Sequence, residues 1–379
     1  MSASVQLRAA IEELRLVDHH VHTVLPGPLD APAFERYLTE SDRPGPAGTT
    51  SFDSQLGFAV RRWCGPVLGL DPSVTASAYL RHRNSMPETW SAGELLTAAG
   101  CSHLLVDTGF AAPGSASLTG LGELSGAKVR EVVRLEPVAE ELARSGCAAA
   151  EFGRRFQELL WQRSAGAVGV KSIVAYRYGL DFDPARPGKA DVAAAAGEWL
   201  RAAQSSGHVR LTHPVLLRHL LWSAVDRGLP LQLHTGFGDP DLDLRRADPA
   251  LARDFLAACT VPVTLLHCYP FHRHAGFLAQ LYPNVYLDVG MTLNHVGVRA
   301  AAVLAETLEL APFAKVLYSS DAYGLPELVY LGARLWRLAM TEVLGAWAAD
   351  GHWTEPDAIR VAGLIGAANA ARLYRLTDT

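Results

Sequence analysis

The sequence predicts an α/β fold, a closed (β/α)8 or TIM barrel, and three observations lead to it. Eight short runs rich in Val, Leu and Ile recur along the chain. Ala/Leu-rich helical patterns lie between most of them. The runs themselves are continuously apolar, which is typical of parallel strands that helices cover on both faces. Eight such alternations favour a barrel. An open doubly wound sheet is the competitor, but no GxGxxG pattern follows the first run.

The elements follow in order along the chain. The predicted strands lie at 14–20, 102–109, 132–137, 167–176, 229–236, 261–269, 284–290 and 315–323. The predicted helices lie at 138–146, 150–163, 191–206, 214–227, 249–259, 273–282, 298–310 and 326–347. A short amphipathic helix precedes the first strand, because Leu7, Ala10, Ile11 and Leu14 recur at helical spacing.

The segment between the first two predicted strands, residues 24–101, is too long for one crossover. Its first half is rich in Pro, Gly and Ser, whereas 55–70 and 72–86 have the pattern of two helices. Active sites of such barrels lie at the C-terminal ends of the strands, where an insertion after a strand also lies. We therefore expect one domain over 1–379, with 24–101 forming an inserted cap or lid.

The composition is that of an ordinary globular protein. Hydrophobic residues make up 49% and charged residues 19%, with a formal net charge of −5. Acidic and basic residues are interspersed, which argues against nucleic acid or an anionic membrane as a partner. The five scattered cysteines and the lack of a signal peptide favour a cytoplasmic protein, and no apolar run is long enough to span a membrane.

Histidines and an aspartate lie at the ends of several predicted strands. His20 and His22 in "VDHHVH" point to the same face of a strand, whereas His19 points to the other. An isolated HxH pair is a weak signal, but His234, His267 and Asp321 close the fifth, sixth and eighth strands. One histidine at such a place is usually a hydrogen-bonded core residue. The whole set at one barrel mouth predicts a site for a divalent cation.

This arrangement resembles the amidohydrolase superfamily. The resemblance implies that His20, His22, His234 and Asp321 bind a metal, and that Asp321 also handles the proton of the attacking water. It implies for His267 either a ligand of a second metal or an acid or electrostatic stabiliser. Zinc is the favoured ion, with manganese, iron or nickel as alternatives, and one or two ions are expected.

Four longer motifs carry the resemblance further. They are "VGVKSIVAYRYGL" (168–180), "LQLHTGFGDPDLDL" (231–244), "LLHCYPFHRHAGFLAQLYPNVYLDVG" (265–290) and "KVLYSSDAYGLPEL" (315–328). They look like the amidohydrolase-2 type domain that also occurs fused to glutamine synthetase, with relatives that act on γ-glutamyl amides. This likeness extends over about residues 10–375.

Lys171 lies on the fourth predicted strand, and a buried lysine must be paired, carboxylated or neutral. Three roles stay open for it. Binuclear members of the superfamily carry a carboxylated lysine at the fourth strand that bridges two metals. A contact to a substrate carboxylate or to Asp321 is the second role, and a structural ion pair is the third.

Three further residues are candidates for substrate binding. Tyr176 and Arg177 follow the fourth strand, and the planar guanidinium of Arg177 suits a carboxylate. Arg177 could instead pair with Asp181 or Asp183. Asp239 follows His234 closely and could position substrate, although a capped, solvated loop is an equal alternative.

These residues together predict an enzyme that hydrolyses a C–N amide bond, other than a peptide bond, in a small carboxylate-bearing molecule such as a γ-glutamyl amide. The expected catalytic residues are Asp321 and His267, acting with a water molecule that the metal activates. The alternatives are a metal-dependent decarboxylase or isomerase on the same scaffold, and a scaffold without activity. The oligomeric state stays open, since "LWRLAMTEVLGAWAA" (335–349) could serve a homo-oligomer or the outer packing of the barrel.

Overall fold

The structure of the chain is a computed structural model, which describes residues 3–377. The described chain divides into two compact units. Unit 1 comprises residues 3–106, 110–130 and 288–377, and unit 2 comprises residues 107–109 and 131–287. The whole predicted insertion, 24–101, belongs to unit 1. The expectation of a single domain over the full chain stays a prediction.

The strands are parallel, and each pairs with a neighbour in chain order. In unit 1, β1 (Leu16–Val21) pairs with β2 (Cys101–Asp107), with an irregularity between Asp18 and Val21. In unit 2 the order continues through the last part of β3 (Lys128–Arg134) and four further strands, paired in succession. These are β4 (Gly169–Ser172), β5 (Leu231–His234), β6 (Val263–Leu266) and β7 (Val285–Leu287).

The eighth predicted strand differs from expectation. Within the described chain, residues 315–323 are assigned no strand. Their backbone nevertheless runs beside β1, where Tyr318 O accepts from His19 N at 3.2 Å, Asp321 N donates to His20 O at 3.0 Å and Ala322 O accepts from His22 N at 2.9 Å. This segment therefore takes the place of an eighth strand next to the first, with hydrogen bonds too irregular for a regular ladder.

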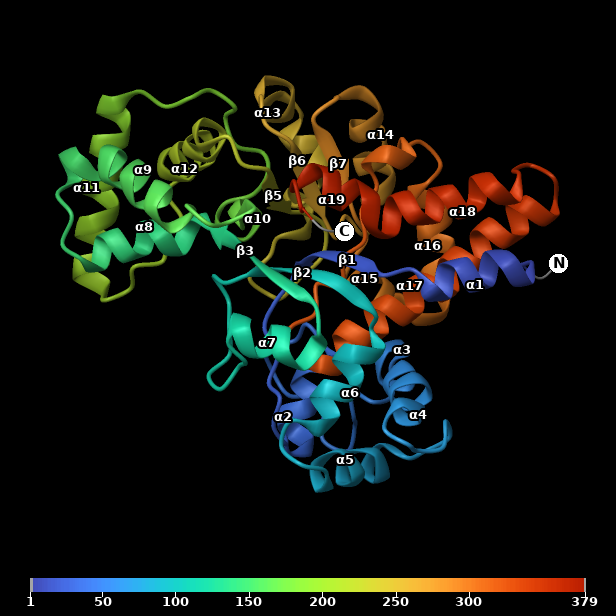
Figure 1. The fold of residues 1–379 in the computed structure, drawn as a ribbon. Helices are drawn as coiled ribbons and strands as arrows, with labels where there is room; N and C mark the ends of the chain where they lie inside the picture. The colour runs from blue at the N-terminus through green and yellow to red at the C-terminus, as the bar shows by residue number, and fades with distance from the viewer. Residues whose placement is uncertain (1–2, 378–379) are drawn as a thin grey trace. The chain divides into compact units, whose positions relative to one another are not determined.

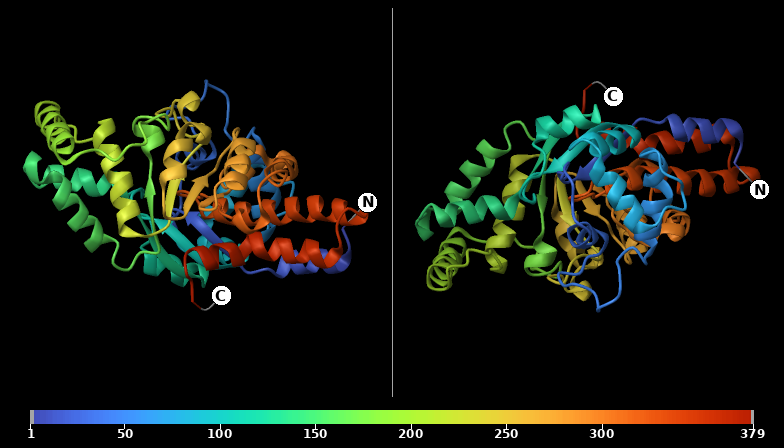
Figure 2. Two further views of the ribbon diagram at one scale, coloured as in Figure 1. Left: turned by 90° about the horizontal axis from the view of Figure 1, so that it is seen from above. Right: turned by 90° about the horizontal axis from the view of Figure 1, so that it is seen from below.

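The helices of unit 1 include those of the insertion and those that follow β7 (Figure 1). They are α1 (Val5–Glu13), α2 (Ala31–Glu35), α3 (Gln55–Ala59), α4 (Gly65–Val67), α5 (Ala76–Ser85), α6 (Trp90–Ala98), α7 (Leu118–Ser125), α15 (Thr292–Val296), α16 (Ala300–Thr307), α17 (Pro326–Ala349), α18 (Glu355–Gly363) and α19 (Asn369–Leu373). The two helices predicted within the insertion correspond to the α3–α4 segment and to α5. As predicted, α1 is amphipathic and buries Leu7 and Ile11, and it packs with α17 and α18 (Figure 2).

The helices of unit 2 lie between its strands along the chain, two after β3, three after β4 and one each after β5 and β6. They are α8 (Leu135–Arg144), α9 (Phe152–Arg163), α10 (Val174–Arg177), α11 (Lys189–Ser206), α12 (Pro214–Arg227), α13 (Arg253–Ala258) and α14 (His272–Leu281). Pro214 begins α12, where a missing N–H costs nothing, and the left-handed Gly228 ends it. The longer of these helices, α8, α9, α11 and α12, pack on one another (Figure 1).

The cores agree with the sequence patterns. Strand residues such as Val17, Leu105, Leu233 and Leu265 are fully buried, as expected of parallel strands with continuous apolar runs. All five cysteines are buried, and no disulfide bond links them. Among the described residues, the helices lack the combination of length and apolar character needed to cross a bilayer.

Candidate metal centre

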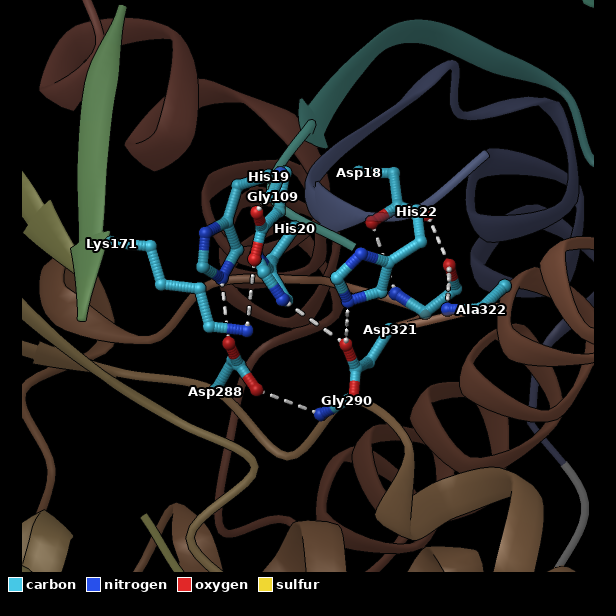
Figure 3. Close-up of polar contacts among 12 residues, drawn as sticks. Asp18, His19, His20, His22, Gly109, Lys171, Asp288, Gly290, Asp321 and Ala322 are labelled. Carbon is cyan, nitrogen blue, oxygen red and sulfur yellow. Dashed lines mark hydrogen bonds and ion pairs between the residues drawn. The ribbon is translucent and has the colours of Figure 1, made fainter. Parts of the chain in front are cut away.

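In unit 1, His20 of β1 and His22, which lies just after that strand, converge on one aspartate. His20 Nε2 lies 3.1 Å from Asp321 Oδ1, and His22 Nε2 lies 3.5 Å from the same oxygen (Figure 3). Both imidazoles are buried, and the Asp321 side chain is 10% exposed. Strand alternation brings the two rings to one side, and the segment beside β1 brings Asp321 to them. The three side chains therefore lie close together, and metal binding by them stays a prediction.

The distance from Asp321 to each of the two imidazoles fits a divalent metal ion. In a tetrahedral zinc site with bonds of about 2.0 Å, neighbouring donor atoms are about 3.3 Å apart. The separations of 3.1 and 3.5 Å from Asp321 Oδ1 to the two imidazole nitrogens lie on either side of this value. Two imidazole nitrogens and a carboxylate oxygen are also a donor set that zinc and its first-row neighbours accept. His20, His22 and Asp321 would hold the ion.

Asp321 is held in place by its own backbone and by Asp18. The φ angle of Asp321 is 48°, in the left-handed region that residues other than glycine rarely adopt. Asp18 accepts hydrogen bonds from the backbone N–H of Ser320 at 3.0 Å and from the Ser320 hydroxyl at 2.5 Å. Burial raises the pKa of Asp18 to about 7, against the opposing effect of the bonds from Ser320. Asp18 thus ties β1 to the residue that precedes Asp321.

His19 lies on the opposite side of β1 from the two ligand candidates. Its Nε2 lies 2.7 Å from Asp288 Oδ2 (Figure 3). Its Nδ1 lies 3.2 Å from the hydroxyl of Tyr374. Asp288 also accepts from the backbone N–H of Gly290 at 2.8 Å. All three side chains are buried. His19 is therefore a packing and hydrogen-bonding residue, as strand alternation predicted.

Unit 2 holds the other two candidate histidines. His234 is the last residue of β5, and His267 follows β6 directly with a φ angle of 67°. Their ring centroids are 4.7 Å apart, and the ring of Tyr176 lies 4.4 Å from that of His234. Gly238 allows this approach, because a Cβ atom there would lie 1.9 Å from the Tyr176 hydroxyl. Metal binding by His234 and His267 stays a prediction.

Lys171 belongs to a buried cluster of charges at the ends of neighbouring strands of unit 2. Its Nζ lies 3.3 Å from Asp107 Oδ2, and Arg134 donates to the same oxygen from Nη2 at 2.5 Å and from Nε at 3.0 Å. Arg134 and Lys171 are register partners on β3 and β4. Gly109 gives Arg134 room, because a Cβ atom at position 109 would lie 2.3 Å from the Cβ of Arg134.

Arg177 has a different partner from the ones considered from the sequence. It forms an ion pair with Glu140, Nη1 to Oε1 at 2.9 Å, and burial lowers the pKa of its guanidinium. The alternative pairing with Asp181 or Asp183 is wrong, because these carboxylates pair with Arg246 and Arg218. The short helix α10 explains this, since it turns Arg177 back toward α8. Substrate binding by Arg177 and Tyr176 stays a prediction.

Asp239 lies in an exposed loop, where its Oδ1 accepts from the backbone N–H of Asp241 at 2.9 Å. That bond is of the kind expected for a capped, solvated loop, which was the alternative to substrate binding. Substrate binding by Asp239 stays a prediction. Sequence reasoning missed Asp107 and Arg134. Asp107 ends β2 and Arg134 ends β3. A polar or charged side chain at a strand end is the same signal that identified His234 and Asp321.

Comparisons with known proteins define the class. A sequence model of the amidohydrolase family matches residues 126–376. The chain belongs to this family. The TIM-barrel class predicted from the sequence is confirmed by the likeness to a Lactobacillus casei protein assigned as a metal-dependent hydrolase. That protein is 28% identical, with a TM-score of 0.87 over 99% of this chain and 98% of the other.

Two further relatives are more limited matches. Protein fluG of Emericella nidulans is 36% identical over 241 residues, which is 60% of this chain and 28% of fluG, so the chain spans less than a third of that relative's length. A uronate isomerase of Bacillus halodurans is 15% identical, with a TM-score of 0.66 over 98% of this chain and 96% of the isomerase. The likeness to the isomerase concerns the fold alone.

Proposed function

We propose that this protein is a metal-dependent hydrolase that cleaves the C–N amide bond of a small carboxylate-bearing molecule, such as a γ-glutamyl amide. The observation that carries the proposal is the convergence of His20 and His22 on Asp321 within 3.1 and 3.5 Å. Membership of the amidohydrolase family and the likeness to the Lactobacillus casei protein support the hydrolytic reaction.

A divalent ion supplies this chemistry by acidifying a water molecule and polarising the substrate carbonyl. The side chains have separate tasks. His20 and His22 would hold the ion. The Asp321 carboxylate accepts the proton of the attacking water and passes it to the leaving amine. His267 stabilises the negative charge that develops on the carbonyl oxygen.

The charged cluster of unit 2 supports the choice of a carboxylate-bearing substrate. Arg134 and Lys171 both contact the carboxylate of Asp107, at the carboxyl ends of β3 and β4. Substrates of parallel α/β barrels bind at this end of the strands. A guanidinium and an ammonium provide directed, charge-assisted hydrogen bonds to a carboxylate.

The test is hydrolysis of a γ-glutamyl amide in 18O-labelled water by the zinc-loaded protein. We expect amine release with one 18O atom in the new carboxylate, and a loss of at least about 100-fold in His20→Ala and in Asp321→Asn. Full activity after exhaustive metal chelation would contradict the scheme. Release of CO2, or conversion of a uronate without 18O uptake, would instead support the lyase or isomerase alternative.

A further inference from the structure

Three aromatic side chains of unit 1 form a wall beside the ligand candidate His22. The Phe110 and Tyr323 rings stack with centroids 4.4 Å apart and an interplanar angle of 27°. The His22 ring meets both edge-on, with centroids 5.8 Å from Phe110 and 5.9 Å from Tyr323. Tyr37 meets the outer edge of Tyr323 at 5.4 Å. We call Tyr37, Phe110 and Tyr323 the aromatic wall.

The aromatic wall is assembled from three separate segments. Tyr37 comes from the insertion, Phe110 from the loop after β2, and Tyr323 from the segment that carries Asp321. Gly324 makes the contact between Tyr37 and Tyr323 possible, because a Cβ atom at position 324 would lie 2.1 Å from the Tyr37 ring. Its φ angle of 73° also favours glycine. The local backbone is thus fitted to the position of the rings.

Phe110 differs from an aromatic residue of the core. The stacked pair Phe34 and Phe52 is 0% and 2% exposed, as core packing requires. Phe110 is stacked at a shorter distance yet remains 46% exposed. A single exposed phenylalanine is ordinary on a protein surface. Here, however, the exposed ring contacts His22, whose Nε2 lies 3.5 Å from the Asp321 carboxylate, so the ring lies beside the candidate metal ligands.

We infer that the aromatic wall is a subsite for an aryl group of the substrate, carried on the leaving amine. This inference rests on the proposed function, in which the substrate carboxylate belongs to the acyl part. An apolar wall does not stabilise that charged group, so the amine part is the portion that suits the aromatic wall. An aryl ring gains both apolar burial and offset stacking against Phe110 and Tyr323, whereas a small alkylamine gains little of either. The substrate class is therefore an N-aryl amide of a carboxylate-bearing acid.

The first experiment compares γ-glutamyl-4-nitroanilide with γ-glutamyl methylamide on the zinc-loaded protein. Phe110→Ala is expected to lower kcat/KM for the anilide at least about tenfold more than for the methylamide. Phe110→Tyr, which keeps the ring, is expected to retain the discrimination, and Phe110→Leu to lose part of it. Phe277→Ala is the matched control, because Phe277 is 48% exposed on α14, outside the aromatic wall. It should change neither rate.

A binding measurement separates this inference from the proposed hydrolysis. Equilibrium dialysis of 4-nitroaniline against the zinc-loaded protein is expected to give saturable binding that Phe110→Ala weakens at least about fivefold and Phe277→Ala leaves unchanged. If that result is obtained and neither amide is hydrolysed, the subsite stands and the proposed reaction fails. The inference is overturned if wild type and Phe110→Ala bind 4-nitroaniline equally, or if the two amide rates fall in parallel in Phe110→Ala.

Discussion

Lys171 Nζ lies 3.3 Å from Asp107 Oδ2, in a buried cluster that also includes the guanidinium of Arg134. This pairing bears on the three roles that the sequence left open for Lys171. Carboxylation would place a second negative charge against Asp107, and two adjacent anions disfavour each other. The ammonium form of Lys171 instead forms an ion pair with the Asp107 carboxylate. We therefore expect Lys171 to act as a cation and to leave metal binding to other residues.

The first prediction concerns Lys171→Met. The zinc content per chain should equal that of the wild type, because the substitution removes no metal ligand. The KM for a carboxylate-bearing amide should rise about 10- to 100-fold, since one charge-assisted hydrogen bond is lost. Elemental analysis and steady-state kinetics check the two parts. Loss of one zinc equivalent, or wild-type activity that depends on added bicarbonate, would indicate a carboxylated bridging lysine instead.

Much of this site follows from strand-end positions in the sequence. A strand alternates its side chains, so His20 and His22 had to share a face. Parallel strands of a barrel end on one side, so Asp321 had to come near that side. Arg177 was not predictable in the same way, because the turn of α10 directs it to Glu140. The irregular eighth segment was also unpredictable, because apolar patterning does not specify how many ladder hydrogen bonds form.

Long-range polar pairs were the least predictable part of the fold. Arg83 lies on α5 of the insertion, and its Nε donates to Glu327 Oε1 of α17 at 2.6 Å, across 244 positions of the sequence. The Tyr79 hydroxyl donates to the same oxygen at 2.9 Å. Charged residues in helical patterns are usually solvated, so nothing in either segment predicted a pair with both side chains buried.

The second prediction is that this pair fastens the insertion to α17. Glu327→Leu leaves the Arg83 guanidinium buried without its carboxylate, so we expect a loss of about 3–5 kcal/mol in the free energy of unfolding. The double variant Arg83→Met/Glu327→Leu removes both charges and should recover at least about 2 kcal/mol of that loss. Urea-induced unfolding of the zinc-loaded protein measures both values.

The matched control is Glu12→Ala. Glu12 pairs with Arg334, also on α17, at 2.9 Å, but its carboxylate is 58% exposed. Removing such an exposed partner should cost less than about 1 kcal/mol. If Glu327→Leu proves no more costly than Glu12→Ala, the buried pair does not stabilise the attachment of the insertion.

The third prediction uses Glu136, which lies in the first turn of α8. Its Oε1 accepts the Ser172 hydroxyl at 2.6 Å and the backbone N–H of Ile173 at 3.0 Å. Burial raises the pKa of this carboxyl above its usual value of 4.5, although the bond from Ser172 acts in the opposite direction. The native protein therefore keeps the Glu136 proton at pH values where the unfolded chain has already lost it.

The sign of the pH effect follows from this difference in proton binding. The native state binds more protons than the unfolded state between pH 4.5 and the native pKa, so the free energy of unfolding falls as pH rises through that window. Glu136→Gln keeps an oxygen for Ser172 and Ile173 and abolishes the titration. The stability of wild type relative to Glu136→Gln should therefore be greatest below pH 4.5 and decrease with rising pH.

Urea unfolding of both proteins at a series of pH values tests this prediction. The control is Glu158→Gln, which changes an exposed carboxylate on α9 and should follow wild type. Parallel stability curves for wild type and Glu136→Gln would show that Glu136 titrates alike in the folded and unfolded chain.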